Sequence, residues 1–130
     1  MVTLAWWPCH DKQNRASLRY DGAHTFLEIA MILEHADIRI DPARAADFEA
    51  AIVHGVTTVI SQARGFQGYK VNRSVESPDR YILMIYWDTL EDHTVAFRGS
   101  EAFTAWRAIV GPFFAQAPVV EHLELVSKSA

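Results

Sequence analysis

Apolar and polar residues alternate along several segments of the chain, which is the pattern of β-strands with one buried face. In residues 34–40 the even-numbered positions from 36 onward are apolar, and the odd-numbered positions are polar. Residues 66–75 and 119–126 show the same period of two. Residues 81–87 are uncharged and apolar on both faces, so this strand needs cover on both sides.

The chain between the first two strands has the spacing of an amphipathic helix. Asp41 followed by Pro42 is a favourable helix start, because aspartate caps the first turn and proline fits the first helical position. We expect the helix to reach Arg64 and to end at Gly65. Its apolar stripe contains Phe48, Ile52, Val56, Val59, Ile60 and Ala63. A polar stripe beside it contains His54, Thr57, Thr58 and Ser61.

A second, interrupted helix is predicted after the third strand. Thr89 with Asp92 three residues later is the pattern of a helix N-cap, and the first piece should end near Phe97. Gly99 then supplies a break and Ser100 a second cap. The apolar stripe of the second piece contains Phe103, Trp106, Ile109 and Val110.

The order of elements is βαββαβ, which predicts an α+β, ferredoxin-like fold with a four-stranded antiparallel sheet. Right-handed crossovers place both helices on one face of that sheet and make the first and last strands neighbours. The other face is left open, although residues 81–87 make it apolar. Apolar surface of this extent indicates a partner.

Composition narrows the class of protein. At 130 residues the chain is one domain, and its net charge of −4 gives no basic footprint for nucleic acid. One cysteine, Cys9, precludes an internal disulfide and fits a reducing, cytoplasmic compartment. No apolar run is long enough to cross a membrane.

The first thirty residues differ from the rest. They show no clear period and no secretory signal pattern. We predict that residues 1–30 are a disordered extension or lie upstream of a natural start at Met31, with the folded module at 31–130.

The space between the helices and the sheet is the expected binding pocket. Its predicted apolar lining is Trp87, Phe97, Phe103 and Trp106. The polar groups expected to reach it are His54, Asn72, Tyr81, His93 and Arg107. The alternative is that the aromatic residues are plain core and that His93 and Asn72 are solvated.

A second polar cluster follows from the pairing of the first and last strands. In this arrangement His35, Asp37 and Arg39 would meet His122 and Glu124. Two histidines and two carboxylates could bind a metal, but a hydrogen-bonded polar face is the default, and no metal site is predicted.

Residues 81–106 carry a resemblance to a known family. This segment resembles the antibiotic biosynthesis monooxygenases. The shared features are a strand that ends in Trp87, the sequence Asp-Thr-Leu-Glu-Asp, a short helix, and the sequence Phe-Arg-Gly-Ser-Glu-Ala-Phe. The similarity extends over about residues 34–126. It implies a dimeric α+β barrel, a homodimer formed through the open sheet faces. Members often carry a histidine where this chain has Phe97; the nearest histidine here is His93.

The resemblance also implies a reaction. The best-understood members of this family oxidise polycyclic phenols to quinones with O₂ and use no flavin, haem or metal. The resemblance therefore implies that no cofactor is needed and that the substrate is an aromatic small molecule. By this analogy Trp87 and Trp106 form the walls of the site. His93 or His54 is the base, and Asn72 or Arg107 stabilises the anion.

Two alternatives stay in view. A related branch cleaves haem and uses an asparagine near the first strand and a histidine in the second helix. That reaction is disfavoured here, because residues 34–40 contain no asparagine and residues 100–116 contain no histidine. The stronger alternative is a non-oxygenase, small-molecule-binding or stress-related α+β barrel dimer, so enzymatic activity is left open.

Overall fold

The computed structural model describes residues 31–130, and the predicted N-terminal extension lies outside the described residues. The strands are β1 (Ile32–Arg39), β2 (Phe66–Arg73), β3 (Arg80–Trp87) and β4 (Val119–Glu124). The main helices are α3 (Ala45–Thr58) and α4 (Glu101–Val110). Short helical turns lie at Pro42–Arg44, Ile60–Gln62, Asp92–Phe97 and Gly111–Phe113.

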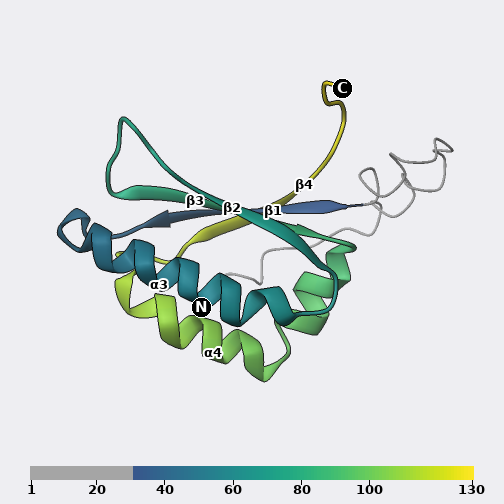
Figure 1. Cartoon of the computed structure of the whole chain (residues 1–130), viewed down its shortest axis with the longest axis horizontal. Coiled ribbons are helices and arrows are strands. Elements are labelled where there is room, and N and C mark those ends of the chain that lie inside the picture. Colours follow the sequence, from purple (N-terminus) through teal and green to yellow (C-terminus); the bar gives the residue numbers. More distant parts are fainter. Residues whose placement is uncertain (1–30) are drawn as a thin grey trace, which may run out of the picture.

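The four strands form one antiparallel sheet in the order β2-β3-β1-β4. Helices α3 and α4 lie side by side under one face of this sheet (Figure 1). The predicted α+β, ferredoxin-like arrangement is confirmed, including the pairing of the first strand with the last. None of the helices in the described part of the chain has the length and apolarity needed to cross a bilayer.

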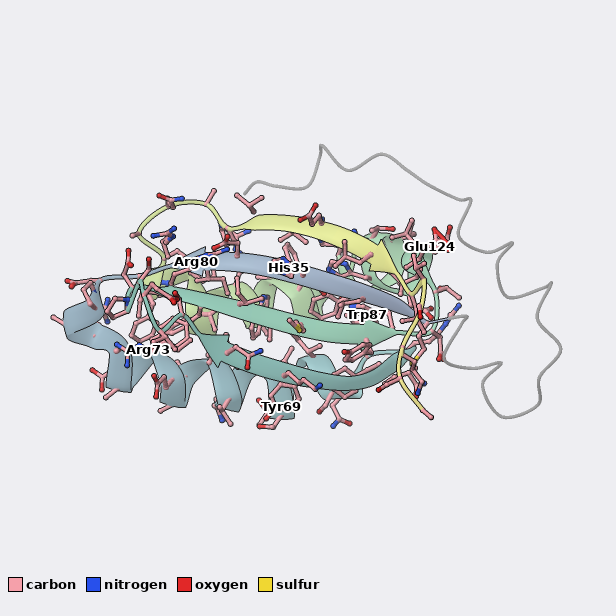
Figure 2. The ribbon with its side chains drawn as sticks, turned by 90° about the horizontal axis from the view of Figure 1, so that it is seen from above. His35, Tyr69, Arg73, Arg80, Trp87 and Glu124 are labelled. Atoms are coloured by element: carbon pink, nitrogen blue, oxygen red, sulfur yellow. The ribbon has the colours of Figure 1, made fainter. Side chains whose placement is uncertain are left out.

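Buried and half-buried residues alternate along β1, which identifies the two faces of the sheet. Even-numbered residues from Ile32 to Ile38 are buried against the helices, and odd-numbered residues are half-buried on the opposite face. Strand β3 alternates in the same way from Tyr81 to Trp87, and the open face that results is seen in Figure 2. Phe48 of α3 is fully buried in the core between the two layers.

The first predicted helix is shorter than expected. Asp41 caps it as predicted, since its Oδ1 accepts a hydrogen bond from the Ala43 amide at 3.0 Å, but the α-helical part ends at Thr58. Thr58 Oγ1 donates to the His54 carbonyl at 2.7 Å. Hydroxyls that bond back to the preceding turn bend or weaken helices. The predicted C-cap at Gly65 is wrong, because Val59 caps α3 and Ala63 caps the short turn that follows; Gly65, with φ +86°, lies in the turn before β2.

The second predicted helix is interrupted where expected, but its first piece is a π-helix, Asp92–Phe97. Thr89 Oγ1 accepts a hydrogen bond from the Asp92 amide at 3.1 Å, as its capping pattern predicted. Ser100 stands at the N-cap position of α4 but does not cap it. Its Oγ donates to the Phe97 carbonyl at 2.7 Å instead, so the expected second cap is wrong.

Candidate active site

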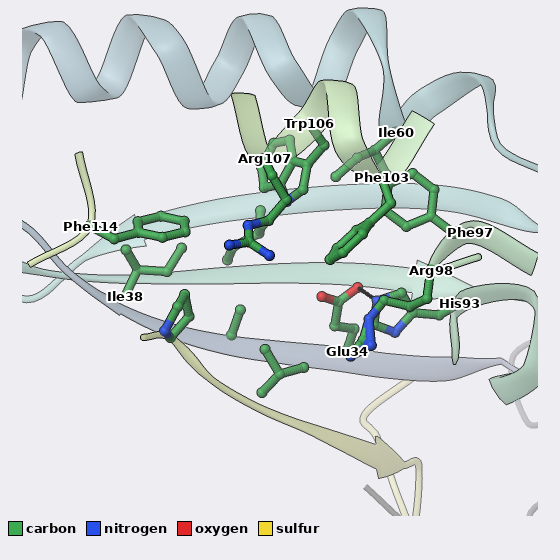
Figure 3. Close-up of a pocket in the computed structure, with 14 residues that line it drawn as sticks. Glu34, Ile38, Ile60, His93, Phe97, Arg98, Phe103, Trp106, Arg107 and Phe114 are labelled. Carbon is green, nitrogen blue, oxygen red and sulfur yellow. Dashed lines mark ion pairs between the residues drawn. The ribbon is translucent and has the colours of Figure 1, made fainter. Parts of the chain in front are cut away.

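A cavity of about 60 Å³ lies between α4 and the sheet. Apolar side chains from both layers form most of its wall, and the polar groups gather at one end and at the helix side (Figure 3). The polar and charged lining residues are Glu34, His93, Arg98 and Arg107. The apolar lining includes Ile38, Ile60, Phe97, Phe103, Trp106 and Phe114.

Glu34 is an acid on the buried face of β1. It is in phase with Ala36 and Ile38, so the strand directs its carboxyl group under the helices, where it is 7% exposed. Trp87 Nε1 donates a hydrogen bond of 2.9 Å to Glu34 Oε1. Burial raises the pKa of Glu34 to about 7, although the Trp87 hydrogen bond and the charge of Arg98 oppose the rise. Near neutral pH this carboxyl group can therefore give or take a proton.

His93 lies next to this carboxyl group. The π-helix buries its imidazole to 4% exposure, stacked on the Trp87 indole at 5.2 Å between ring centres. His93 Nε2 is 3.4 Å from Glu34 Oε1, and its Nδ1 is 2.8 Å from His122 Nε2. Burial lowers the pKa of His93 well below its usual value, and His122 and Arg98 lower it further, so the ring is neutral.

The three side chains Glu34, His93 and His122 form a continuous chain of proton donors and acceptors. A neutral imidazole has one donor and one acceptor nitrogen. When His93 Nδ1–H donates to His122, Nε2 faces Glu34 as an acceptor and can take a proton from the protonated carboxyl group. The opposite tautomer donates to the carboxylate. The arrangement can therefore move a proton between the cavity and β4.

Two arginines line the cavity: Arg107 from α4, and Arg98 from the end of the π-helix beside His93 and Glu34 (Figure 3). The Arg98 and Arg107 guanidinium carbons lie 5.4 and 5.7 Å from the centre of the Phe103 ring, within the range of cation–π attraction. Burial lowers the pKa of Arg98, while the negative charge of Glu34 opposes this change. Both guanidinium groups remain positively charged. The cavity thus combines aromatic walls, an acid–base pair and two cations.

The structure brings several of the predicted site residues together. Phe97, Phe103, Trp106, His93 and Arg107 all line the cavity. The Trp87 indole lies behind His93, where it supports the imidazole and hydrogen-bonds to Glu34 rather than forming an outer wall.

Three other predicted residues lie elsewhere, and their expected placement is corrected. His54 is exposed on α3, because the buried stripe of that helix passes through Ile52 and Val56. Asn72 is exposed on β2 opposite Ile82, on the sheet face that points away from the helices. Tyr81 is buried, but its hydroxyl group donates to Glu49 at the other end of α3.

Tyr81 also has the wrong acid–base character for proton transfer near neutral pH. Burial and its hydrogen bond to Glu49 raise the pKa of Tyr81 to about 12. Arg73 lies over the Tyr81 ring, 5.5 Å from its centre, so the group is a structural cluster at the hairpin end of the molecule.

The sequence-based prediction did not place Glu34 or Arg98 in the pocket, and it assigned His122 to a separate polar cluster rather than beside His93. The signal for Glu34 was a charged residue in the apolar phase of an alternating strand, since such a residue must be buried. The expected cluster on the open face is also corrected. His122 pairs with Glu34 in the β1–β4 register, whereas His35 pairs with Glu121. No group of three metal-binding side chains occurs within residues 31–130.

The sheet order, the two helices on one face and the cavity between the two layers define an α+β, ferredoxin-like protein. The sequence profile of the antibiotic biosynthesis monooxygenase family matches residues 31–109. The chain belongs to this family.

Individual relatives agree with this assignment. A crystal structure of a provisionally assigned antibiotic biosynthesis monooxygenase from Bordetella bronchiseptica is 42% identical, with a TM-score of 0.71, and the match covers 75% of this chain and 99% of that one. A similarly described protein from Caulobacter crescentus CB15 is 28% identical over 82% of this chain and 100% of its own, with a TM-score of 0.65. The uncharacterised protein YczJ of Bacillus subtilis (strain 168) is 33% identical over 72% of this chain and 98% of its own length.

Proposed function

We propose that this protein is a monooxygenase that uses O₂ to oxidise an ionisable aromatic small molecule in the cavity beneath α4. Family membership supports a monooxygenase-type function. The observation that carries the proposal is the buried pair of Glu34 and His93 at the end of an aromatic cavity. A general base works best when its pKa is near the working pH, and the pKa of Glu34 is raised to about 7.

The reaction begins with removal of a proton from the hydroxyl group of the substrate. Glu34, in its ionised form, accepts this proton directly or through His93, and His93 can pass it to His122 along the hydrogen bond between their rings. The substrate anion then gives one electron to O₂, and the radical pair combines to form a carbon–oxygen bond.

The peroxide formed in this way breaks down within the same site. Its O–O bond breaks as the ring carbon loses its hydrogen as a proton, which gives a new carbonyl group and water. The sum is one phenol and one O₂ converted to one quinone and one H₂O. The electrons come from the substrate anion, so the proposed reaction requires no bound flavin, haem or metal.

The electrostatics of the cavity favour the anionic intermediate. Arg98 and Arg107 place positive charge beside the aromatic wall, and cations placed where negative charge develops lower the barrier to its formation. The remainder of the lining is mostly apolar, which suits O₂ and keeps bulk water away from the radical pair. Arg107 thus keeps its predicted role as anion stabiliser, and Arg98 joins it.

The size of the cavity limits how the substrate enters. Its volume of about 60 Å³ is well below the roughly 300–1,000 Å³ that is common for ligand sites. Phe103 and Arg107 are half-buried, whereas Trp106 is buried in the core. We expect the two half-buried side chains to move aside when a ring enters.

Oxygen uptake with a panel of phenols, naphthols and anthrones, measured with and without a chelator, tests the function. We expect uptake that survives chelation. The Glu34→Gln and His93→Gln variants should then lower kcat by roughly 100-fold or more, because proton transfer by a positioned group contributes about 10²–10⁴. His54→Gln is the matched control, since His54 is exposed away from the cavity. Equal rates in all variants would refute the assigned roles.

A non-oxygenase reaction or simple binding is the second candidate. It is favoured by one specific observation: the Glu34–His93 pair transfers protons without any need for O₂. Binding of the same phenols, or their isomerisation, without oxygen uptake would support this alternative over the monooxygenase.

The protein is also proposed to be a homodimer formed through the open sheet face. Half-buried Ile82, Met84 and Tyr86 line this face of β3, and Leu123 of β4 is 42% exposed. Tyr86→Arg should convert a dimer to a monomer in sedimentation experiments, whereas Gln67→Arg, an exposed substitution at the start of β2, should not. A monomeric wild-type protein would contradict this part of the proposal.

A cytoplasmic location is part of the same proposal, and fits a chain with a single cysteine.

A further inference from the structure

The two arginines of the cavity differ from every other arginine in residues 31–130. Those others have protein partners: Arg39, Arg64, Arg73 and Arg80 pair with carboxylates, and Arg44 donates to a backbone carbonyl. The guanidinium groups of Arg98 and Arg107 form neither an ion pair nor a hydrogen bond with any residue of the described chain. Both are half-buried and both face the Phe103 ring.

Unpaired guanidinium groups in a partly buried site are costly, because the cation loses water without gaining a partner. The cost is visible at Arg98, whose pKa is lowered by burial and by the nearby charge of Arg107. Glu34 is the one acid in the lining, and it lies beyond ion-pairing distance of either guanidinium. The cavity therefore holds more positive charge than its own acid neutralises.

The shape of the cations indicates which anion they fit. A guanidinium group presents two parallel N–H donors, which match the two oxygens of a carboxylate. The Phe103 ring lies within cation–π range of both guanidiniums and offers a flat surface for a second ring. A carboxylate attached directly to an aromatic ring would place both groups correctly at once.

We infer that the ligand of this cavity is an aromatic carboxylate that carries a ring hydroxyl group. Its carboxylate binds between Arg98 and Arg107, its ring packs against Phe103, and its hydroxyl group faces Glu34 and His93. The inference specifies the substrate class of the proposed monooxygenase and rests on that proposal only for the oxidation step. Binding of the acid follows from the arginines alone.

The charges balance in this arrangement. When the hydroxyl group loses its proton to Glu34, the ligand carries a carboxylate and a phenolate, which match the two guanidinium groups. Glu34 becomes neutral at the same step, so its carboxyl group does not repel the phenolate that forms beside it. A neutral phenol would leave one guanidinium group unpaired throughout.

Binding measured by calorimetry without O₂ tests the inference. The probes are hydroxybenzoates and hydroxynaphthoates, each compared with its methyl ester, which keeps the ring and the hydroxyl group but removes the charge. We expect at least one acid to bind 10-fold or more tightly than its ester. This preference should disappear in Arg98→Gln and in Arg107→Gln, and it should survive in Arg73→Gln, which removes an arginine at the hairpin end.

Several outcomes would overturn the inference. One is an ester that binds as tightly as its acid; another is a preference for the acid that survives in both cavity variants. Failure of every acid to bind at millimolar concentration counts against it as well. Circular dichroism checks that each variant is folded. Arg107→Lys keeps the charge but not the paired donors, so it should retain part of the preference for the acid over its ester. An acid that binds without later oxygen uptake would refute the monooxygenase and leave this inference intact.

Discussion

Replacing Glu34 with glutamine should change how the stability of the protein depends on pH. The pKa of this carboxyl group is 4.5 in an unfolded chain and about 7 in the fold, because burial disfavours the ionised form. Below pH 4.5 the group is protonated in both states, so its contribution is fully present. As pH rises, the unfolded chain ionises first, and folding stability falls until the folded group also ionises near pH 7.

The size of the effect follows from the same two values. One pKa unit corresponds to about 1.4 kcal/mol, so a change from 4.5 to about 7 makes the ionised fold about 3 kcal/mol less stable than the protonated fold. Most of this loss, about 2–3 kcal/mol, falls between about pH 5 and pH 8. Glutamine does not ionise, and its oxygen can still accept the hydrogen bond from Trp87 Nε1.

Urea denaturation followed by tryptophan fluorescence measures this difference. At one fixed protein concentration, the free energy of unfolding of Glu34→Gln relative to wild type should rise by about 2–3 kcal/mol from about pH 5 to pH 8. Groups that titrate alike in both proteins cancel in this difference. Glu91→Gln is the control, because it makes the same substitution at an exposed position outside the cavity lining. A Glu34→Gln difference that is constant with pH would refute the raised pKa.

Two further substitutions test the core and the support of the site. Gly55→Ala should destabilise the fold by about 1–3 kcal/mol in urea denaturation, because the added carbon would lie 2.8 Å from Trp106 Cζ3. Combining it with Trp106→Phe should recover part of this loss. If the effects of the two substitutions are strictly additive, the clash is excluded. Trp87→Phe removes a hydrogen bond that lowers the pKa of Glu34, so the pH-dependent loss of stability should shift to higher pH. An unchanged pH dependence would show that the indole N–H does not act on the carboxyl group.

The fold was predictable because its signals are local. Alternation with a period of two identified three strands, an uncharged apolar run identified β3, and the Asp41–Pro42 pair marked the first helix start correctly. The errors lie where local signals compete. The hydroxyl of Thr58 bonds back to His54, and the hydroxyl of Ser100 bonds to Phe97 rather than capping α4. A sequence shows that such side chains can form these bonds but not which acceptor they choose.

The candidate site was only partly predictable, because it depends on register. Asn72 and His54 were expected in the pocket on the strength of their side-chain chemistry, yet one lies on the open sheet face and the other on the exposed side of α3. Glu34 was visible in the sequence as an acid at an apolar phase of β1. His122 is far from Glu34 in the sequence and lies opposite it only because β4 pairs with β1 in one particular register.

The position of His93 depends on the π-helix, which no sequence pattern predicted. The Arg98 amide donates to the His93 carbonyl at 3.0 Å, five residues back, which widens this turn into a π-helix. Such turns are rare and are often found at functional sites. Here the wide turn buries His93 between the Trp87 indole and His122 and also starts the loop that turns Arg98 toward the cavity. A regular α-helical turn would shift the angle between residues 93 and 98 by about one residue, or about 100°. The π-helical turn therefore sets the direction in which Arg98 points relative to His93, and both side chains line the cavity.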